Sequence, residues 1–119
     1  MTAIEAIERA DGLRPNAYND DIKDEWLKEL DGRIEREILC IREGFVKEAE
    51  STGLHRTLFA EEPYSEMYVY YLMMKADFMN GETERFNNDA IMFNTAWLNY
   101  ANHINRTRLV NTNTGIRIA

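Results

Sequence analysis

The last third of the chain contains a run of apolar residues that repeats with the period of a packed α-helix. Its members are Phe86, Ala90, Phe93, Trp97, Tyr100 and Ile104. The spacings alternate between four and three residues, which places every member on one side of a helix. The pattern predicts a helix over about residues 82–106 that packs along its length against other helices. The other faces of this helix are rich in asparagine, although asparagine is a mediocre helix former.

A second stripe with the same period lies nearer the N-terminus. It consists of Ile22, Trp26, Leu30, Ile34, Ile38, Ile41 and Phe45. Asn19 or Asp20 can cap the helix that carries it. Asp31-Gly32 reads as a helix breaker within the stripe. Because the stripe keeps its phase across this pair, we favour one helix with a local weak point over two separate helices.

Two more helices have recognisable ends. Thr2 and Glu5 have the spacing of a capping box, which predicts a short first helix that stops near Gly12. Another helix is expected to start after Pro63 and to stop at Gly81, because glycine commonly follows the last helical residue.

These patterns predict an all-α fold in a single domain. The chain has 119 residues, and its 45% of apolar residues can supply one sizeable core. We expect a compact bundle of about four helices over residues 1–106, in which residues 43–63 form a connection without a clear period. The tail, residues 107–119, contains residues that favour strands. We therefore expect a short extended C-terminal arm, which can form a small hairpin or add a strand to a neighbour.

The helix expected after Pro63 is apolar on all sides between Met67 and Met74. A helix without a polar face must be buried all round, and we expect a chain of this length to lack enough cover for it. Tyrosine and methionine are enriched at protein interfaces. Core packing and base stacking are the alternative roles for the aromatic side chains. The candidate interface residues are Tyr64, Met67, Tyr68, Tyr70, Tyr71 and Met74.

The net charge of −7 is unevenly distributed. All acidic residues precede Ala90, so residues 1–89 carry −10 and the remainder carries +3. An acidic body repels phosphate backbones, which argues against ordinary binding to duplex DNA. The acids of the second helix form either a solvated face or a functional acidic surface past which DNA can slide. The candidate acidic face comprises Asp21, Asp24, Glu25, Glu29 and Glu35.

The basic charges after residue 89 are three arginines near the C-terminus. They can form a solvated end, anchor an arm on an acidic neighbour, or contact DNA. The candidate arm residues are Arg106, Arg108, Leu109, Val110, Ile116, Arg117 and Ile118.

The sequence contains no recognisable pattern of a metal-binding or catalytic site. His55, His103 and the single cysteine, Cys40, lie in separate segments without metal-ligand spacing. Phosphate-binding glycine loops and nucleophile elbows are absent. We therefore predict no enzyme activity, metal, cofactor or small-molecule substrate. The longest apolar run has eight residues and no apolar signal region is visible, so we expect neither a membrane span nor a secretory leader.

Several segments together resemble a protein family. They are PYSEMYVYYL at 63–72, DFMNGE at 77–82, FNN at 86–88, FN at 93–94 and NRT at 105–107, with IEA at 4–6, RPN at 14–16 and LDGRI at 30–34. In combination they resemble the head–tail connector, or adaptor, proteins of tailed bacteriophages and prophages. The likeness covers most of the chain and is weakest at residues 43–54 and in the last ten residues.

The resemblance implies a structural protein of virion assembly. Its copies would form a homo-oligomeric ring between a portal protein and a tail-side neck protein, and DNA would pass through the ring without sequence-specific binding. The protein would occupy the host cytoplasm during assembly and then the head–tail junction of the virion, without a membrane. An extended C-terminal segment would grip the portal or a neighbour. The alternative is a small soluble helical regulatory protein that binds a single partner through its aromatic helix.

Overall fold

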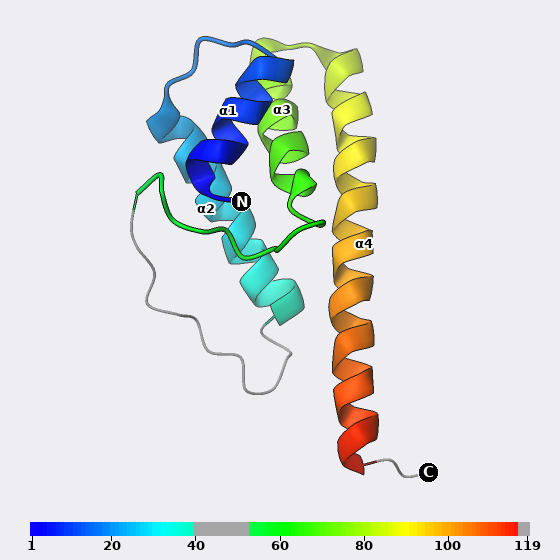
Figure 1. Ribbon diagram of the computed structural model, residues 1–119. Coiled ribbons are helices and arrows are strands. Elements are labelled where there is room, and N and C mark those ends of the chain that lie inside the picture. The colour runs from blue at the N-terminus through cyan, green and yellow to red at the C-terminus, as the bar shows by residue number, and fades with distance from the viewer. Residues whose placement is uncertain (40–52, 117–119) are drawn as a thin grey trace.

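The computed structural model describes residues 1–39 and 53–116, and the side chains among them up to Thr107 (Figure 1). The helices are α1 (Ala3–Leu13), α2 (Asp20–Ile34), α3 (Glu66–Asn80) and α4 (Thr83–Ile116), and a π-helical turn, η1 (Glu35–Leu39), follows α2 directly. The described residues contain no strand, and an isolated bridge joins Thr2 to Thr57. The prediction of an all-α bundle is confirmed.

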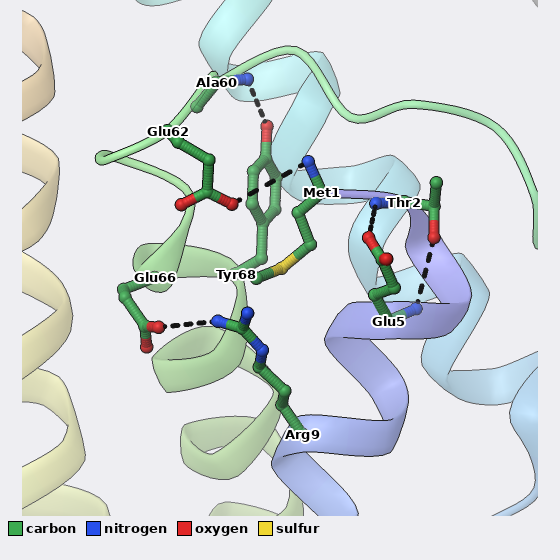
Figure 2. Close-up of polar contacts among 8 residues, drawn as sticks. All are labelled: Met1, Thr2, Glu5, Arg9, Ala60, Glu62, Glu66 and Tyr68. Atoms are coloured by element: carbon green, nitrogen blue, oxygen red, sulfur yellow. Dashed lines mark hydrogen bonds and ion pairs between the residues drawn. The ribbon is translucent and has the colours of Figure 1, made fainter.

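The capping box at the start of α1 is formed as predicted. The Glu5 amide donates a hydrogen bond to Thr2 Oγ1 at 3.3 Å, and the Thr2 amide donates to Glu5 Oε1 at 2.9 Å (Figure 2). These two bonds satisfy N–H groups that otherwise lack partners in the first turn. The apolar residues Ala3, Ala6, Ile7 and Ala10 of α1 are buried, and the small alanines allow close packing against α3.

The helix α2 passes through Asp31-Gly32 without a break and leads directly into η1. The preference for one helix over two is therefore confirmed as far as Leu39. Trp26, Leu30, Ile34 and Ile38 of the predicted stripe are buried. Ile22, predicted as part of the same stripe, is 40% exposed, because at this end of α2 the buried face carries Lys23 and Asp24 instead. These two side chains pair with Asp11 and Arg56. The predicted members Ile41 and Phe45 lie outside the described residues.

The prediction that α3 has more apolar surface than one chain can cover is wrong. Met67, Tyr68 and Tyr71 are at most 6% exposed, and Tyr64, Tyr70 and Met74 are partly buried against the same core. The physical reason is the central position of α3, which contacts α1, α2 and α4 (Figure 1). Three neighbouring helices thus provide the cover that we had expected from another chain.

The prediction of an extended C-terminal arm is also wrong, because α4 continues to Ile116. In this region the Thr107 hydroxyl donates a hydrogen bond to the His103 carbonyl at 3.0 Å, which keeps that polar group within the helix. Adding a residue to an existing helix costs far less than starting a new element, so weak helix formers can extend a long helix. Of the candidate arm residues, Arg108, Leu109, Val110 and Ile116 therefore belong to α4. Arg117 and Ile118 lie outside the described residues.

The helices α3 and α4 form an antiparallel hairpin that turns at Gly81. Gly81 adopts a left-handed conformation with φ of 75°, and the Glu82 amide donates to the Asp77 carbonyl at 2.9 Å. This is the glycine-terminated end that the sequence predicted. From this turn α4 runs along α3 and extends well past the rest of the bundle (Figure 1).

Candidate functional site

A buried ionic cluster joins α1, α3 and α4 near the α3–α4 turn. The Arg14 guanidinium donates hydrogen bonds to the carboxylates of Asp77 and Asp89, the second at 3.3 Å. Asp77 is 1% exposed and Asp89 is 5% exposed. One arginine that follows α1 therefore binds a carboxylate from each helix of the α3–α4 hairpin, which ties the three helices together.

Asp89 is the electrostatically perturbed member of this cluster. Burial raises the pKa of its carboxyl from 3.8 to about 6, and the hydrogen bond with Asp77 adds to the rise. The positive charge of Arg14 lowers the pKa of Asp89, but Asp77 binds the same guanidinium, so the two carboxylates share this charge. Because Arg14 binds both acids, the geometry favours a structural role for the pair.

An open hollow of about 380 Å³ lies beside this cluster at the α3–α4 turn. It is lined by Asp77, Phe78, Gly81, Glu82, Thr83, Phe86 and Asn87. The rings of Phe78 and Phe86 lie 5.6 Å apart, and Phe78 and its neighbour Met79 are both exposed. We call Phe78, Met79 and Phe86 the turn patch. An exposed apolar patch beside a hollow suits contact with another protein better than it suits the binding of a polar substrate.

The expected acidic face of α2 is only partly an exposed surface. Asp24 is buried, and its carboxylate accepts a hydrogen bond from Arg56 Nη1 at 2.5 Å. Its assignment to a solvated or DNA-facing surface is wrong, because Arg56 in the connection before α3 neutralises it inside the protein. Lys28 Nζ also lies 3.5 Å from Asp24.

The other acids of this face differ in their surroundings. Asp21 and Glu25 are exposed, and Glu35 is half-buried. Glu29 is exposed but makes two polar contacts. It accepts a hydrogen bond from the Tyr71 hydroxyl at 2.9 Å and lies 3.3 Å from Lys75 Nζ. Burial, followed by this hydrogen bond, raises the pKa of Tyr71. The remaining acidic surface is therefore smaller than the sequence indicated.

Tyr68 forms the central polar contact of the core. Its hydroxyl donates to Asp31 Oδ1 at 2.6 Å. The same hydroxyl accepts from the Ala60 amide at 2.8 Å (Figure 2). Burial raises the pKa of Tyr68 well above its ordinary value, so the hydroxyl stays protonated and can donate. The contact explains why an aspartate occurs at position 31 within α2, although the sequence pattern Asp31-Gly32 is typical of a helix break. Sequence reasoning missed it because the partners are distant along the chain.

Polar contacts also hold α1 against the start of α3. Arg9 Nη1 donates to Glu66 Oε2 at 2.9 Å, and the Met1 amino nitrogen lies 4.0 Å from Glu62 Oε2 (Figure 2). Both pairs lie near the surface, where an ion pair contributes little to stability. They orient the two elements, and the buried apolar contacts supply most of the stabilisation.

Among the described side chains, three exposed large apolar residues lie on α4 away from the turn patch. Ile91 is 63% exposed, Leu98 is 59% exposed and Met92 is 48% exposed. Ile91 and Leu98 belong to a run with spacings of four and three: Glu84, Asn88, Ile91, Thr95, Leu98 and Asn102. All six are exposed, and we call this run, together with Arg106 one turn further, the outer stripe. The same alternation as in the buried stripe could have revealed it, but its asparagines obscured the apolar members.

The histidines and the cysteine are not brought together. His103 stacks on the Tyr64 ring with centroids 4.6 Å apart, His55 is exposed, and Cys40 lies outside the described residues. Within residues 1–39 and 53–116 no group of histidine, cysteine, aspartate or glutamate side chains is arranged to hold a metal ion. In the same segments no helix has both the length and the apolar character that crossing a membrane requires.

The chain was also compared with known proteins. No family model, no curated protein and no solved structure matches it.

Proposed function

We propose that the protein is a structural assembly subunit that works through protein–protein contacts, as a head–tail connector of a tailed phage or prophage. The observation that carries this proposal is the position of the exposed apolar side chains. Among the described residues, the turn patch and the outer stripe of α4 each carry two exposed large apolar side chains, and they are different surfaces of the same hairpin. A subunit that acts alone has no evident use for two such surfaces.

Two unlike contact surfaces are what a ring subunit needs. A cyclic ring forms when one surface of each copy binds a different surface of the next copy. The turn patch and the outer stripe can serve as these two surfaces, and a portal or neck protein can cover what remains. The resemblance of residues 63–72 and 77–82 to connector proteins supports the same role. The exposed Asp21 and Glu25 on α2 suit a surface that DNA passes without binding.

The experiment is to measure particle size by light scattering over a range of protein concentrations, with and without a portal ring. We expect larger assemblies or binding to the portal. Phe78→Asp should weaken that binding, because it places a charge in an apolar contact. Leu13→Asp is the matched control, because Leu13 is 62% exposed and Phe78 is 64% exposed, and Leu13 lies on α1. A protein that stays monomeric and never binds a portal would contradict the proposal.

The alternative of a regulator that binds one partner through its aromatic helix has less support. Met67, Tyr68 and Tyr71 are enclosed by the bundle, so a partner could reach them only after the helices separate. Enzyme activity is weaker still as a proposal, since the two buried carboxylates beside the hollow are both bound to Arg14.

A further inference from the structure

We propose that the free protein forms a two-fold dimer, in which the outer stripe of α4 packs antiparallel against the outer stripe of a second copy. The outer stripe lies on the side of α4 opposite Phe93 and Tyr100, which are buried in the bundle. The bundle therefore cannot cover it. The occupant we assign is a second copy of this chain, for three reasons.

The first reason is the spacing. From Glu84 to Asn102 the stripe alternates steps of four and three residues, the period with which two long helices pack side by side. The helix α4 has 34 residues, so the stripe offers several turns of continuous contact. Thr95 lies at its centre and is small enough for the two backbones to approach closely.

The second reason is the match between apolar residues when one helix is reversed about Thr95. Within the stripe, Ile91 is the member before Thr95 and Leu98 is the member after it. In an antiparallel pair Ile91 of one copy therefore faces Leu98 of the other, and the contact occurs twice. Both side chains are more than half exposed in the single chain and would be covered in the pair.

The third reason is the match between polar and charged residues in the same arrangement. Asn88 faces Asn102, and two amide side chains can donate to and accept from each other. Glu84 faces Arg106 at both ends of the contact, and both side chains are exposed. An antiparallel pair also brings opposite ends of the two helix dipoles together.

A parallel pair lacks these advantages. It would place Glu84 against Glu84 and Arg106 against Arg106, which is unfavourable for like charges. It would also align the helix dipoles in the same direction. The polar members of the stripe therefore select the antiparallel arrangement, in the way that asparagine and charged residues set the register of coiled coils.

The pairing goes beyond the proposed connector function, although it uses the same stripe. A two-fold dimer is closed, so it hides the outer stripe and prevents uncontrolled growth of free subunits. A partner that takes up the stripe must then compete with the second copy. The contact involves few large apolar side chains, so we expect a weak dimer that dissociates on dilution.

Sedimentation and light scattering of the purified protein test the pairing without a portal. We expect a monomer–dimer equilibrium that Leu98→Asp weakens at least about tenfold, because a charge would be buried opposite Ile91. Leu13→Asp should leave the equilibrium unchanged, and circular dichroism should show that both variants keep their helices. A protein that is monomeric at every concentration overturns the pairing, but portal binding by that monomer would leave the connector function standing.

Cross-linking tests the direction of the helices. Glu84→Cys and Arg106→Cys are prepared separately, each with Cys40→Ser, and are treated with a short thiol cross-linker alone and after mixing. Cross-linked dimers should form in the mixture and not in either variant alone. Cross-linking of Glu84→Cys with itself would indicate a parallel pair and would overturn the proposal, as would a dimer that cross-links in no combination.

Discussion

At the scale of single residues, a few buried polar side chains position the helices. Tyr68 joins α3 to Asp31 of α2 and to the backbone at Ala60, and Arg14 joins α1 to both arms of the α3–α4 hairpin. A buried donor or acceptor without a partner is costly, so such contacts exclude other packing arrangements. Each contact can be removed by a substitution that keeps most of the side-chain volume.

Tyr68→Phe removes the hydroxyl that donates to Asp31 and accepts from Ala60. We expect the free energy of unfolding to fall by about 1–3 kcal/mol, because the buried Ala60 amide loses its acceptor. Urea denaturation measures this change. Tyr18→Phe is the control: the Tyr18 hydroxyl donates to Asn80 at 2.7 Å in an exposed position, where water can replace it. An equal loss in both variants would contradict the central role of Tyr68.

Asp89 makes stability depend on pH. Its pKa is about 6 in the folded protein and 3.8 ordinarily, so the folded state binds the proton more tightly than the unfolded state. Its stabilising contribution is complete below pH 3.8 and is lost as the pH rises through 6. We expect a loss on the order of 1–2 kcal/mol, less than the roughly 3 kcal/mol of an unscreened shift of this size.

Denaturation at a series of pH values measures this effect. In Asp89→Asn the part of the pH dependence between pH 4 and pH 6 should largely disappear, because asparagine does not titrate in this range. Asp21→Asn is the control, since Asp21 is exposed. If Asp89→Asn retains the full wild-type slope in this window, the shift belongs to another group.

At the scale of the elements, the α3–α4 hairpin is the framework of the protein. The helix α3 fills the centre of the bundle, and α4 carries one face against it and the opposite face outward. The turn at Gly81 determines how the two helices meet. Its left-handed φ of 75° is accessible to glycine without strain and costly for residues with a Cβ atom.

Gly81→Ala should therefore lower the free energy of unfolding by about 1 kcal/mol or more. Gly12→Ala is the matched comparison, because Gly12 lies inside α1 and an added Cβ would meet no atom within 4 Å. That variant should gain about 0.5–1 kcal/mol, since alanine favours a helix more than glycine does. Thermal and urea unfolding measure both changes. A loss of stability in both variants would contradict the assignment of Gly81 as the special turn residue.

At the scale of the whole molecule, the balance between covered and exposed apolar surface bears on function. The apolar middle of α3 is buried within one chain, so it gives this chain no reason to associate with another. The turn patch and the outer stripe are exposed instead, and the proposed connector role and the proposed dimer depend on them. Matched aspartate variants at Phe78, Leu98 and Leu13 separate the contributions of these surfaces.

The sequence by itself determined the class and the main elements of the fold. Capping boxes, glycine stops and stripes of period 3.6 act over a few residues, so Thr2, Gly81 and the packed stripe from Phe93 to Ile104 were predicted correctly. Phe86, at the start of the predicted stripe, is only half-buried and lies in the turn patch instead. The extension of α4 beyond residue 106 was missed, because local propensity favoured an extended tail and helix continuation overcame it.

Only the tertiary structure decided which surfaces remain exposed. Whether Tyr68 faces a partner or the core depends on helices that are distant along the chain, and their packing enclosed it. The sequence predicts Asp24 as a surface acid, whereas in the structure Arg56 lies against it and pairs with it. Ile91 and Leu98 became the exposed apolar surface because the bundle covers the opposite side of α4. Burial is a property of the assembled helices, so periodicity can indicate that a face is apolar without specifying what covers it.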